Sequence, residues 1–285
     1  MRVSFLLTAA VVLAACDTAT APRSTQSSVD DSRVPAELRA AYLEDANRLA
    51  LRDLLATGFS DVPIPQDAVQ PYYNALVLVY NATVLPARDT VVNVYSIHAR
   101  GPATRSLLLQ LLGTETWVER LARREIPTGE PTVDTLLARY SLSVGTVYPL
   151  HDGDVLITLG PPEPLNITAL AGLFHGISGV RFAEPNNLIG DGNDIGGLID
   201  GSRVLLDYSV GYGDCPAGCI ARRFYHFAVR DDGTVEYLGA SGSPPPTPAA
   251  PKAKRAPRGA RSHSGTSYCT QFPCGSGFGL STTTR

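Results

Sequence analysis

The amino terminus constrains this chain most, because it determines which residues remain to fold and in which compartment. Arg2 is followed by an uncharged apolar run from Val3 to Val12 and by small residues up to Ala15. A basic start, an apolar stretch of about 7–15 residues and small residues before the cut are typical of a secretory signal peptide, and the run is shorter than the roughly 20 residues that span a membrane. We therefore expect residues 1–15 to be removed and the remainder to fold outside the cytoplasm.

The four residues that end this segment, Leu13-Ala14-Ala15-Cys16, resemble the lipobox of bacterial lipoproteins. The resemblance implies that Cys16 carries lipid and anchors the mature chain to a membrane on its extracytoplasmic side, in the cell envelope. Ordinary cleavage near Ala15, which leaves Cys16 as a free thiol, is the alternative.

Composition divides the mature chain into three parts. Residues 16–33 are mostly Thr, Ser and Asp and are expected to form a flexible tether. Residues 34–243 have the apolar content of one α+β globular body, and residues 244–285 are rich in Pro, Ala and basic side chains, which cannot bury a core. We expect this tail to be solvated, or to contact anionic lipid or a cell-wall polymer.

Charge is distributed unevenly between these parts. The segment from Pro244 onward contains six basic residues and no acidic one, which leaves 18 basic against 27 acidic residues elsewhere, a net charge of −9. An acidic body argues against nucleic acid as a partner.

Once Cys16 is set aside, the cysteines form two close pairs, Cys215 with Cys219 and Cys269 with Cys274. In an oxidising compartment such short spacings favour local disulfides, although four cysteines allow three pairings. Zinc binding by Cys215, Cys219 and His226 is the alternative, but it lacks a clear fourth ligand.

Hydrophobic periodicity predicts two helices, a run of strands and short helices, and a closing meander of three strands. The predicted helices are residues 36–57, 69–81, 115–124 and 132–140. The predicted strands are residues 91–98, 107–112, 144–148, 155–159, 203–210, 222–230 and 234–239.

Between these segments, Asn166 is expected to cap a helix that carries Leu170 and Phe174 and leads into a strand from Val180 to Ala183. The pattern from Leu170 to Asn187, which includes Gly-Val and Ala-Glu-Pro-Asn, resembles the closing helix and strand of subtilisin-type propeptides and related inhibitor domains. The resemblance implies a ferredoxin-like α/β sandwich here.

The stretch from Ile189 to Gly197, IGDGNDIGG, is the best candidate for a ligand site. Asp191, Asn193 and Asp194 place oxygen donors in a glycine-rich loop, and oxygen is the ligand that calcium requires. The loop resembles a single calcium-binding nonapeptide unit, but no second repeat completes it. The alternatives are a calcium site and a plain turn.

The same stretch and a later one, GDCPAGCI, resemble an uncharacterised group of secreted or lipid-anchored bacterial proteins. That resemblance covers about residues 41–242 and implies no particular activity.

The sequence contains none of the common hydrolase, metalloprotease, phosphate-loop or dinucleotide motifs. His98 is the one histidine that we consider as a catalytic base, and Ser96 and Ser241 are candidate nucleophiles without a supporting motif. We expect an envelope lipoprotein that acts as a non-catalytic binding or interaction module and contacts an envelope protein or cell-wall polymer. A protease-inhibitor-like module and an unrecognised extracytoplasmic hydrolase are the alternatives.

Overall fold

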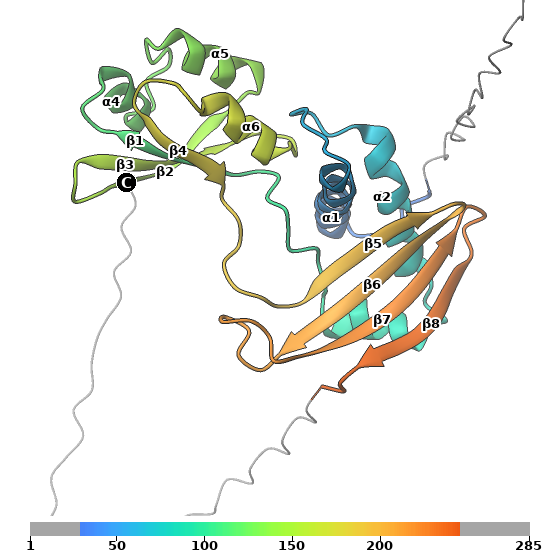
Figure 1. Ribbon diagram of the computed structural model, residues 1–285. Helices are drawn as coiled ribbons and strands as arrows, with labels where there is room; N and C mark the ends of the chain where they lie inside the picture. The colour runs from blue at the N-terminus through green and yellow to red at the C-terminus, as the bar shows by residue number, and fades with distance from the viewer. Residues whose placement is uncertain (1–28, 246–285) are drawn as a thin grey trace, which may run out of the picture. The chain divides into compact units, whose positions relative to one another are not determined.

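The computed structural model describes residues 29–245, in which six α-helices, one π-helix and eight strands form two four-stranded antiparallel sheets (Figure 1). The α+β prediction is confirmed. The two sheets have separate hydrophobic cores, and the described residues together form one compact unit.

The first two helices lie where periodicity placed them. Helix α1 spans Ala36–Ala56 and helix α2 spans Gln66–Asn81, and each begins directly after a proline whose fixed φ suits the start of a helix. The two helices pack against each other and bury Leu49 and Tyr72.

The predicted strand over residues 91–98 is wrong. The chain instead forms helix α3, Pro86–Asp89, which continues as the π-helix η1, Thr90–Val94, closed by a bond from the Tyr95 amide to the Thr90 carbonyl. Proline at the first position starts the helix, and a strand here would need a partner strand. Val91 is buried, whereas Val94 is 70% exposed, so the valines turn around a helix.

The first sheet has ferredoxin-like connectivity, as the resemblance to subtilisin-type propeptides implied. Its strands run in the order β2-β3-β1-β4, with two short helices in the first crossover and one in the second. The elements are β1 Leu107–Leu112, α4 Thr116–Ala122, α5 Pro131–Arg139, β2 Ser143–Pro149, β3 Asp154–Gly160, α6 Ile167–Phe174 and β4 Val180–Pro185.

One face of this sheet packs on its helices, and the other is open. Leu109 and Ile157, which are register partners, and Phe174 of α6 are fully buried in the core. The open face carries a row across all four strands, set by pairing of Gln110 with Leu156 and Phe182 and of Leu156 with Tyr148. Tyr148 is 59% exposed.

The second sheet is a meander in which every neighbouring pair of strands is consecutive in sequence. Its strands are β5 Asp194–Asp200, β6 Arg203–Tyr212, β7 Ala221–Arg230 and β8 Val235–Gly242. The last three confirm the predicted meander. Strand β5 was not expected, because two glycines and two aspartates, residues that are poor in strands, hide its short apolar run.

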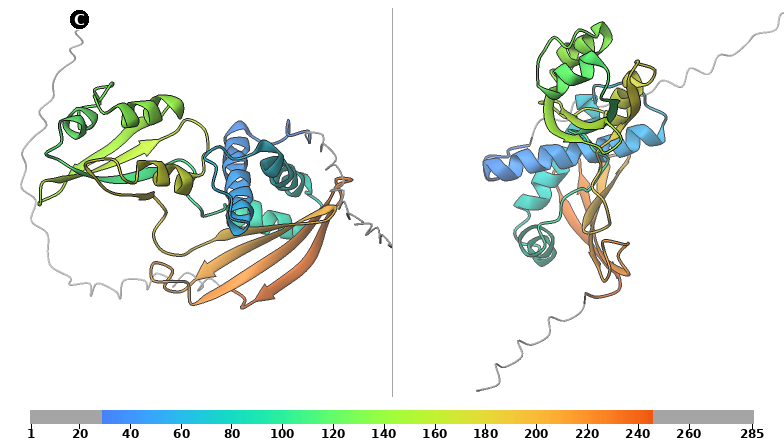
Figure 2. Two further views of the ribbon diagram at one scale, coloured as in Figure 1. Left: turned by 45° about the horizontal axis from the view of Figure 1, so that its top comes forward. Right: turned by 90° about the vertical axis from the view of Figure 1, so that its left-hand side faces the viewer.

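Helices α1 and α2 cover one face of the second sheet, as both views in Figure 2 show. Leu206, Tyr208 and Phe227 point into this core and are almost completely buried. The opposite face carries Asp207, Phe224 and His226.

The segments that lead into and out of the first sheet lie side by side. Leu107 is paired with Pro185, the Asn186 amide donates to the Ser106 carbonyl at 2.9 Å, and the Ala103 amide donates to Asn187 Oδ1 at 2.9 Å. The helices that cover the second sheet therefore precede the first sheet in the sequence, and the strands of the second sheet follow it.

Candidate functional site

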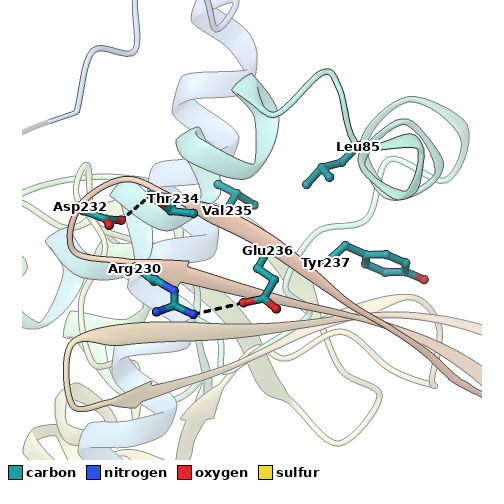
Figure 3. A pocket seen from close by; sticks show the side chains of 7 residues that line it. All are labelled: Leu85, Arg230, Asp232, Thr234, Val235, Glu236 and Tyr237. Atoms are coloured by element: carbon teal, nitrogen blue, oxygen red, sulfur yellow. Dashed lines mark hydrogen bonds and ion pairs between the residues drawn. The ribbon is translucent and has the colours of Figure 1, made fainter.

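A groove of about 620 Å³ lies beside strand β8, between that strand and the turn that precedes α3 (Figure 3). Apolar side chains of the turn and the strand stand opposite one another, and polar side chains of the β7–β8 hairpin form its rim. The lining residues are Leu85, Arg230, Asp232, Thr234, Val235, Glu236 and Tyr237.

Local hydrogen bonds hold the rim of this groove in shape. The Thr234 amide donates to Asp232 Oδ1 at 2.9 Å, and this bond lowers the pKa of the Asp232 carboxyl. Gly233 adopts a φ of +84°, which glycine tolerates and which the tight turn requires. Arg230 Nη2 lies 3.4 Å from Glu236 Oε2, with both side chains about half exposed. The rim therefore offers one cation and two carboxylates next to apolar side chains.

Within residues 29–245, strand β8 is also an edge strand, since it pairs only with β7. An edge strand presents backbone N–H and C=O groups that no adjacent strand uses. Beside this groove they are available to an extended peptide.

A second constellation crosses the open face of the same sheet. Asp207 of β6, His226 of β7 and Ser241 of β8 form a hydrogen-bonded chain: His226 Nδ1 lies 2.6 Å from Asp207 Oδ1, and His226 Nε2 lies 2.8 Å from Ser241 Oγ. The Phe224 ring stacks parallel to the His226 ring, with centroids 6.2 Å apart.

The third polar feature is a histidine and aspartate pair beneath a smaller cavity. His98 Nδ1 lies 2.7 Å from Oδ2 of Asp45, whose other oxygen accepts a hydrogen bond from the Ala99 amide at 2.9 Å. The hydrogen bond to Asp45 raises the pKa of His98, and burial raises the pKa of Asp45. The cavity beside them has a volume of about 280 Å³ and also contacts Ser96.

Ser96 has a φ of +44°, which is uncommon for a residue with a side chain. Its hydroxyl donates to the Val92 carbonyl at 3.3 Å, and the structure gives it no hydrogen bond to His98. The cavity therefore holds a candidate base with a raised pKa but no activated nucleophile, and the hydroxyl that does meet a histidine is that of Ser241.

The three predicted calcium ligands do not converge. Asp191 pairs with Arg222, which lowers the pKa of its carboxyl to about 2, and Asp194 pairs with Arg52 at 2.8 Å. Asn193 Oδ1 accepts from the Gly211 amide at 3.2 Å. Arginines and amides thus occupy these oxygens, and residues 29–245 contain no group of three or more His, Cys, Asp or Glu side chains that could hold a metal ion. The geometry lends the calcium prediction no support.

The disulfide between Cys215 and Cys219 is present in the structure, as the spacing predicted. It closes the β6–β7 loop, where the Asp191 amide donates to the Cys215 carbonyl at 2.8 Å and the Cys219 amide donates to Asp191 Oδ2 at 3.1 Å. Asp191 therefore fastens the predicted ligand loop to the disulfide loop. The alternative of zinc fails here, because both thiols are used in the bridge.

The other predicted site residues, Cys16, Cys269 and Cys274, lie outside the described residues, as do the predicted signal peptide and most of the tail. Within residues 29–245 no single helix is long and apolar enough to cross a membrane; only α2 together with α3 and η1 meets that length and composition, with a bend of 108° between them.

Sequence reasoning singled out His226 and Ser241 but missed Asp207 and the contact among the three. The available signal was that Asp207 and His226 are polar residues on strands of one predicted meander; Ser241 lies two residues beyond the predicted end of the last strand, which the structure extends to Gly242. Their alignment depends on a register shift between His226 and Phe227, which the sequence does not reveal.

Comparison with known proteins found no matching family model, no matching curated protein and no matching solved structure.

Proposed function

We propose that this protein is a lipid-anchored binding module of the cell envelope, and that the groove beside β8 binds an extended peptide segment of a partner protein. The observation that carries this proposal is the position of a groove of about 620 Å³ directly beside an edge strand.

Strand addition explains why these two features belong together. A peptide that pairs with an exposed strand gains main-chain hydrogen bonds, and pockets beside the strand select among its side chains. Here Leu85 and Tyr237 offer apolar contacts, while Arg230 and Glu236 offer one charge of each sign. The groove therefore suits a segment in which an apolar side chain is followed by a polar or charged one.

The binding experiment begins with a displayed library of random linear peptides, selected on the immobilised mature protein. A selected peptide is then titrated against the wild type and against Leu85→Ala and Tyr237→Ala. Loss of a side chain that anchors a peptide costs about 1.4 kcal/mol or more, so we expect the Kd to rise at least about 10-fold. The control is Tyr148→Ala, which removes an exposed tyrosine on the other sheet and should leave the Kd unchanged; thermal melts check that Tyr237→Ala, whose ring is partly buried, keeps the fold.

A backbone test separates strand addition from simple apolar contact. Peptides methylated on alternate backbone nitrogens lose the donors that pair with β8 and should bind more weakly than the parent. If the library yields no binder, or if the binders respond equally to Tyr148→Ala and Tyr237→Ala, the groove is not the binding site.

The anchor is tested separately through Cys16. Labelling with a fatty-acid analogue should be lost in Cys16→Ala and retained in Cys215→Ser, which removes a cysteine that is bridged in the structure. Labelling that survives in Cys16→Ala would exclude the lipid anchor.

Protease inhibition is a second candidate function, favoured by one observation. The segment that resembles subtilisin-type propeptides coincides with α6 and β4, which close a ferredoxin-like unit. Subtilisin assayed with the mature protein should then show slow, saturable inhibition; an unchanged rate at about 100-fold molar excess of the protein would dismiss this candidate.

A further inference from the structure

We infer that Asp207, His226 and Ser241 form a nucleophilic centre that attacks carboxylic esters. The order of atoms is the one that such a centre requires: a carboxylate contacts one ring nitrogen of a histidine, and a serine hydroxyl contacts the other. This inference concerns the open face of the second sheet and does not rest on the groove beside β8.

The protonation pattern follows from the two contacts. An ionised carboxylate only accepts hydrogen bonds, so at 2.6 Å from Asp207 the Nδ1 of His226 must carry the proton. In a neutral ring Nε2 is then an acceptor, and the Ser241 hydroxyl donates to it at 2.8 Å. Ser241 thus has a base in contact with its proton, and Asp207 holds that base in the tautomer that can accept it.

The sheet holds the three side chains in this geometry. Asp207 and His226 are register partners on β6 and β7, and the register shift after His226 aligns Ser241 with Phe224 on the neighbouring strand. The Phe224 ring stacks on the His226 ring, whose side chain is 30% exposed. Strands place a catalytic group more rigidly than loops do.

The proposed step is acyl transfer. Ser241 Oγ forms a bond to the ester carbonyl carbon while His226 Nε2 takes the hydroxyl proton, and the negative charge develops on the carbonyl oxygen. The bond to the alkoxide then breaks, and the alkoxide takes the proton from His226. The oxygen of a water molecule then forms a bond to the acyl carbon while His226 Nε2 takes one of its protons. The bond from that carbon to Ser241 Oγ breaks, the acid leaves, and His226 returns the proton to Ser241 Oγ.

The surroundings point to an ester of a small or apolar acid. Ser241 lies on the edge strand, so a substrate can approach from the side on which no strand is paired, where outward backbone N–H groups can meet the developing oxyanion. Leu238 of the same strand is 51% exposed, which offers apolar surface for the acyl chain on β8 itself.

The experiment uses the mature protein and a fluorophosphonate probe, which bonds covalently to activated serines. We expect one phosphonate per chain, mapped to Ser241 by peptide sequencing. Ser241→Ala should abolish the label, and Ser243→Ala, which removes a hydroxyl two residues away on the same chain segment, should retain it.

Two further variants separate activation from exposure. A general base contributes about 10²–10⁴-fold, so His226→Gln should slow labelling by about 10²-fold or more. Asp207→Asn tests a positioning residue: it should lower the maximal labelling rate and leave the probe concentration for half-maximal rate unchanged. Hydrolysis of p-nitrophenyl acetate should follow the same ranking.

Two outcomes would overturn the inference. One is a wild-type protein with no phosphonate on Ser241, which makes the three residues a polar contact between strands. The other is a Ser241 label whose rate is unchanged in His226→Gln. Thermal melts of all variants confirm that each retains the wild-type fold, as expected for side chains on the open face.

Discussion

The two sheets are built on one plan, yet their open faces differ. Each has four antiparallel strands with helices on one face. In the first, Leu107 pairs with Pro185 from a distant part of the chain, and the open row of Tyr148, Leu156, Gln110 and Phe182 is mostly apolar. In the second, consecutive hairpins align Asp207, His226 and Ser241 in contact with one another.

The open faces of the two sheets also differ in their polar contacts. Polar contacts on the first open face meet at Asp154 of β3, whose Oδ2 accepts a hydrogen bond from Gln110 Nε2 at 2.6 Å and lies 3.5 Å from Arg181 Nε. On the second sheet, hydrogen bonds cross three strands, and the groove beside β8 and the disulfide loop belong to the same meander. The chemistry of this chain is thus concentrated in the second sheet, while the first supplies a scaffold with an apolar face.

The largest expected effect is a loss of stability when a core side chain of the second sheet is truncated. It tests the contrast between the buried core of the second sheet and the open face of the first. Phe227 is fully buried, and Phe227→Ala should lower the free energy of unfolding by about 3–5 kcal/mol. Phe182→Ala, on the open face of the first sheet, should lower it by less than about 1.5 kcal/mol, because that ring already contacts solvent. Denaturant titrations of both variants measure the two values, and equal losses would contradict the division.

The disulfide gives the next effect. Replacing Cys215 and Cys219 together by Ser opens a short loop, so the free energy of unfolding should fall by about 2 kcal/mol. Reducing agent should destabilise the wild type by a similar amount and leave the double variant unchanged. A double variant as stable as the wild type would show that the contacts of Asp191 alone hold the loop.

A cap in the first sheet should matter less. Asn166 accepts a hydrogen bond from the Ala169 amide at 3.2 Å at the start of α6 and donates to the Asp61 carbonyl at 3.1 Å. Asn166→Ala should cost about 1–2 kcal/mol, and Asn166→Asp, which keeps the accepting oxygen, should recover part of it. Denaturant titration measures the loss. A lower denaturation midpoint in Asn166→Ala, with peptide binding to the groove beside β8 unchanged, would show that the two sheets have separate roles.

The smallest expected effect is a pH dependence of the stability that the His98 and Asp45 pair contributes. The folded pKa of His98 is raised above 6.5 by Asp45, so the stabilisation is fully present below that value and is lost as the pH rises through the raised pKa. The Asp45→Asn variant lacks the carboxylate that raises the pKa of His98, so this pH-dependent stabilisation is removed. Thermal melts between about pH 6 and pH 9 should therefore show a smaller decline in the variant than in the wild type; parallel curves would contradict the assignment.

The sequence predicts structure that depends on neighbouring residues well, and contacts between residues far apart in the chain poorly. Helices α1 and α2, the cap at Asn166 and the local disulfide all follow from neighbours in the chain. The strand predicted over residues 91–98 failed because branched side chains favour strands only where a partner strand exists. Asp191, Asn193 and Asp194 were grouped as ligands because sequence does not show Arg52 and Arg222 approaching from other elements.

The neighbouring positions of Ser106 and Asn186, joined by a hydrogen bond of 2.9 Å, make the first sheet a removable insert. Chain segments that leave and rejoin a fold at adjacent points are where whole domains can be spliced in or out. Joining Gly101 to Leu188 through a few glycines should therefore leave α1, α2 and the meander foldable. The excised residues 102–187 would be a portable ferredoxin-like domain whose two ends can be fused into the loop of another host.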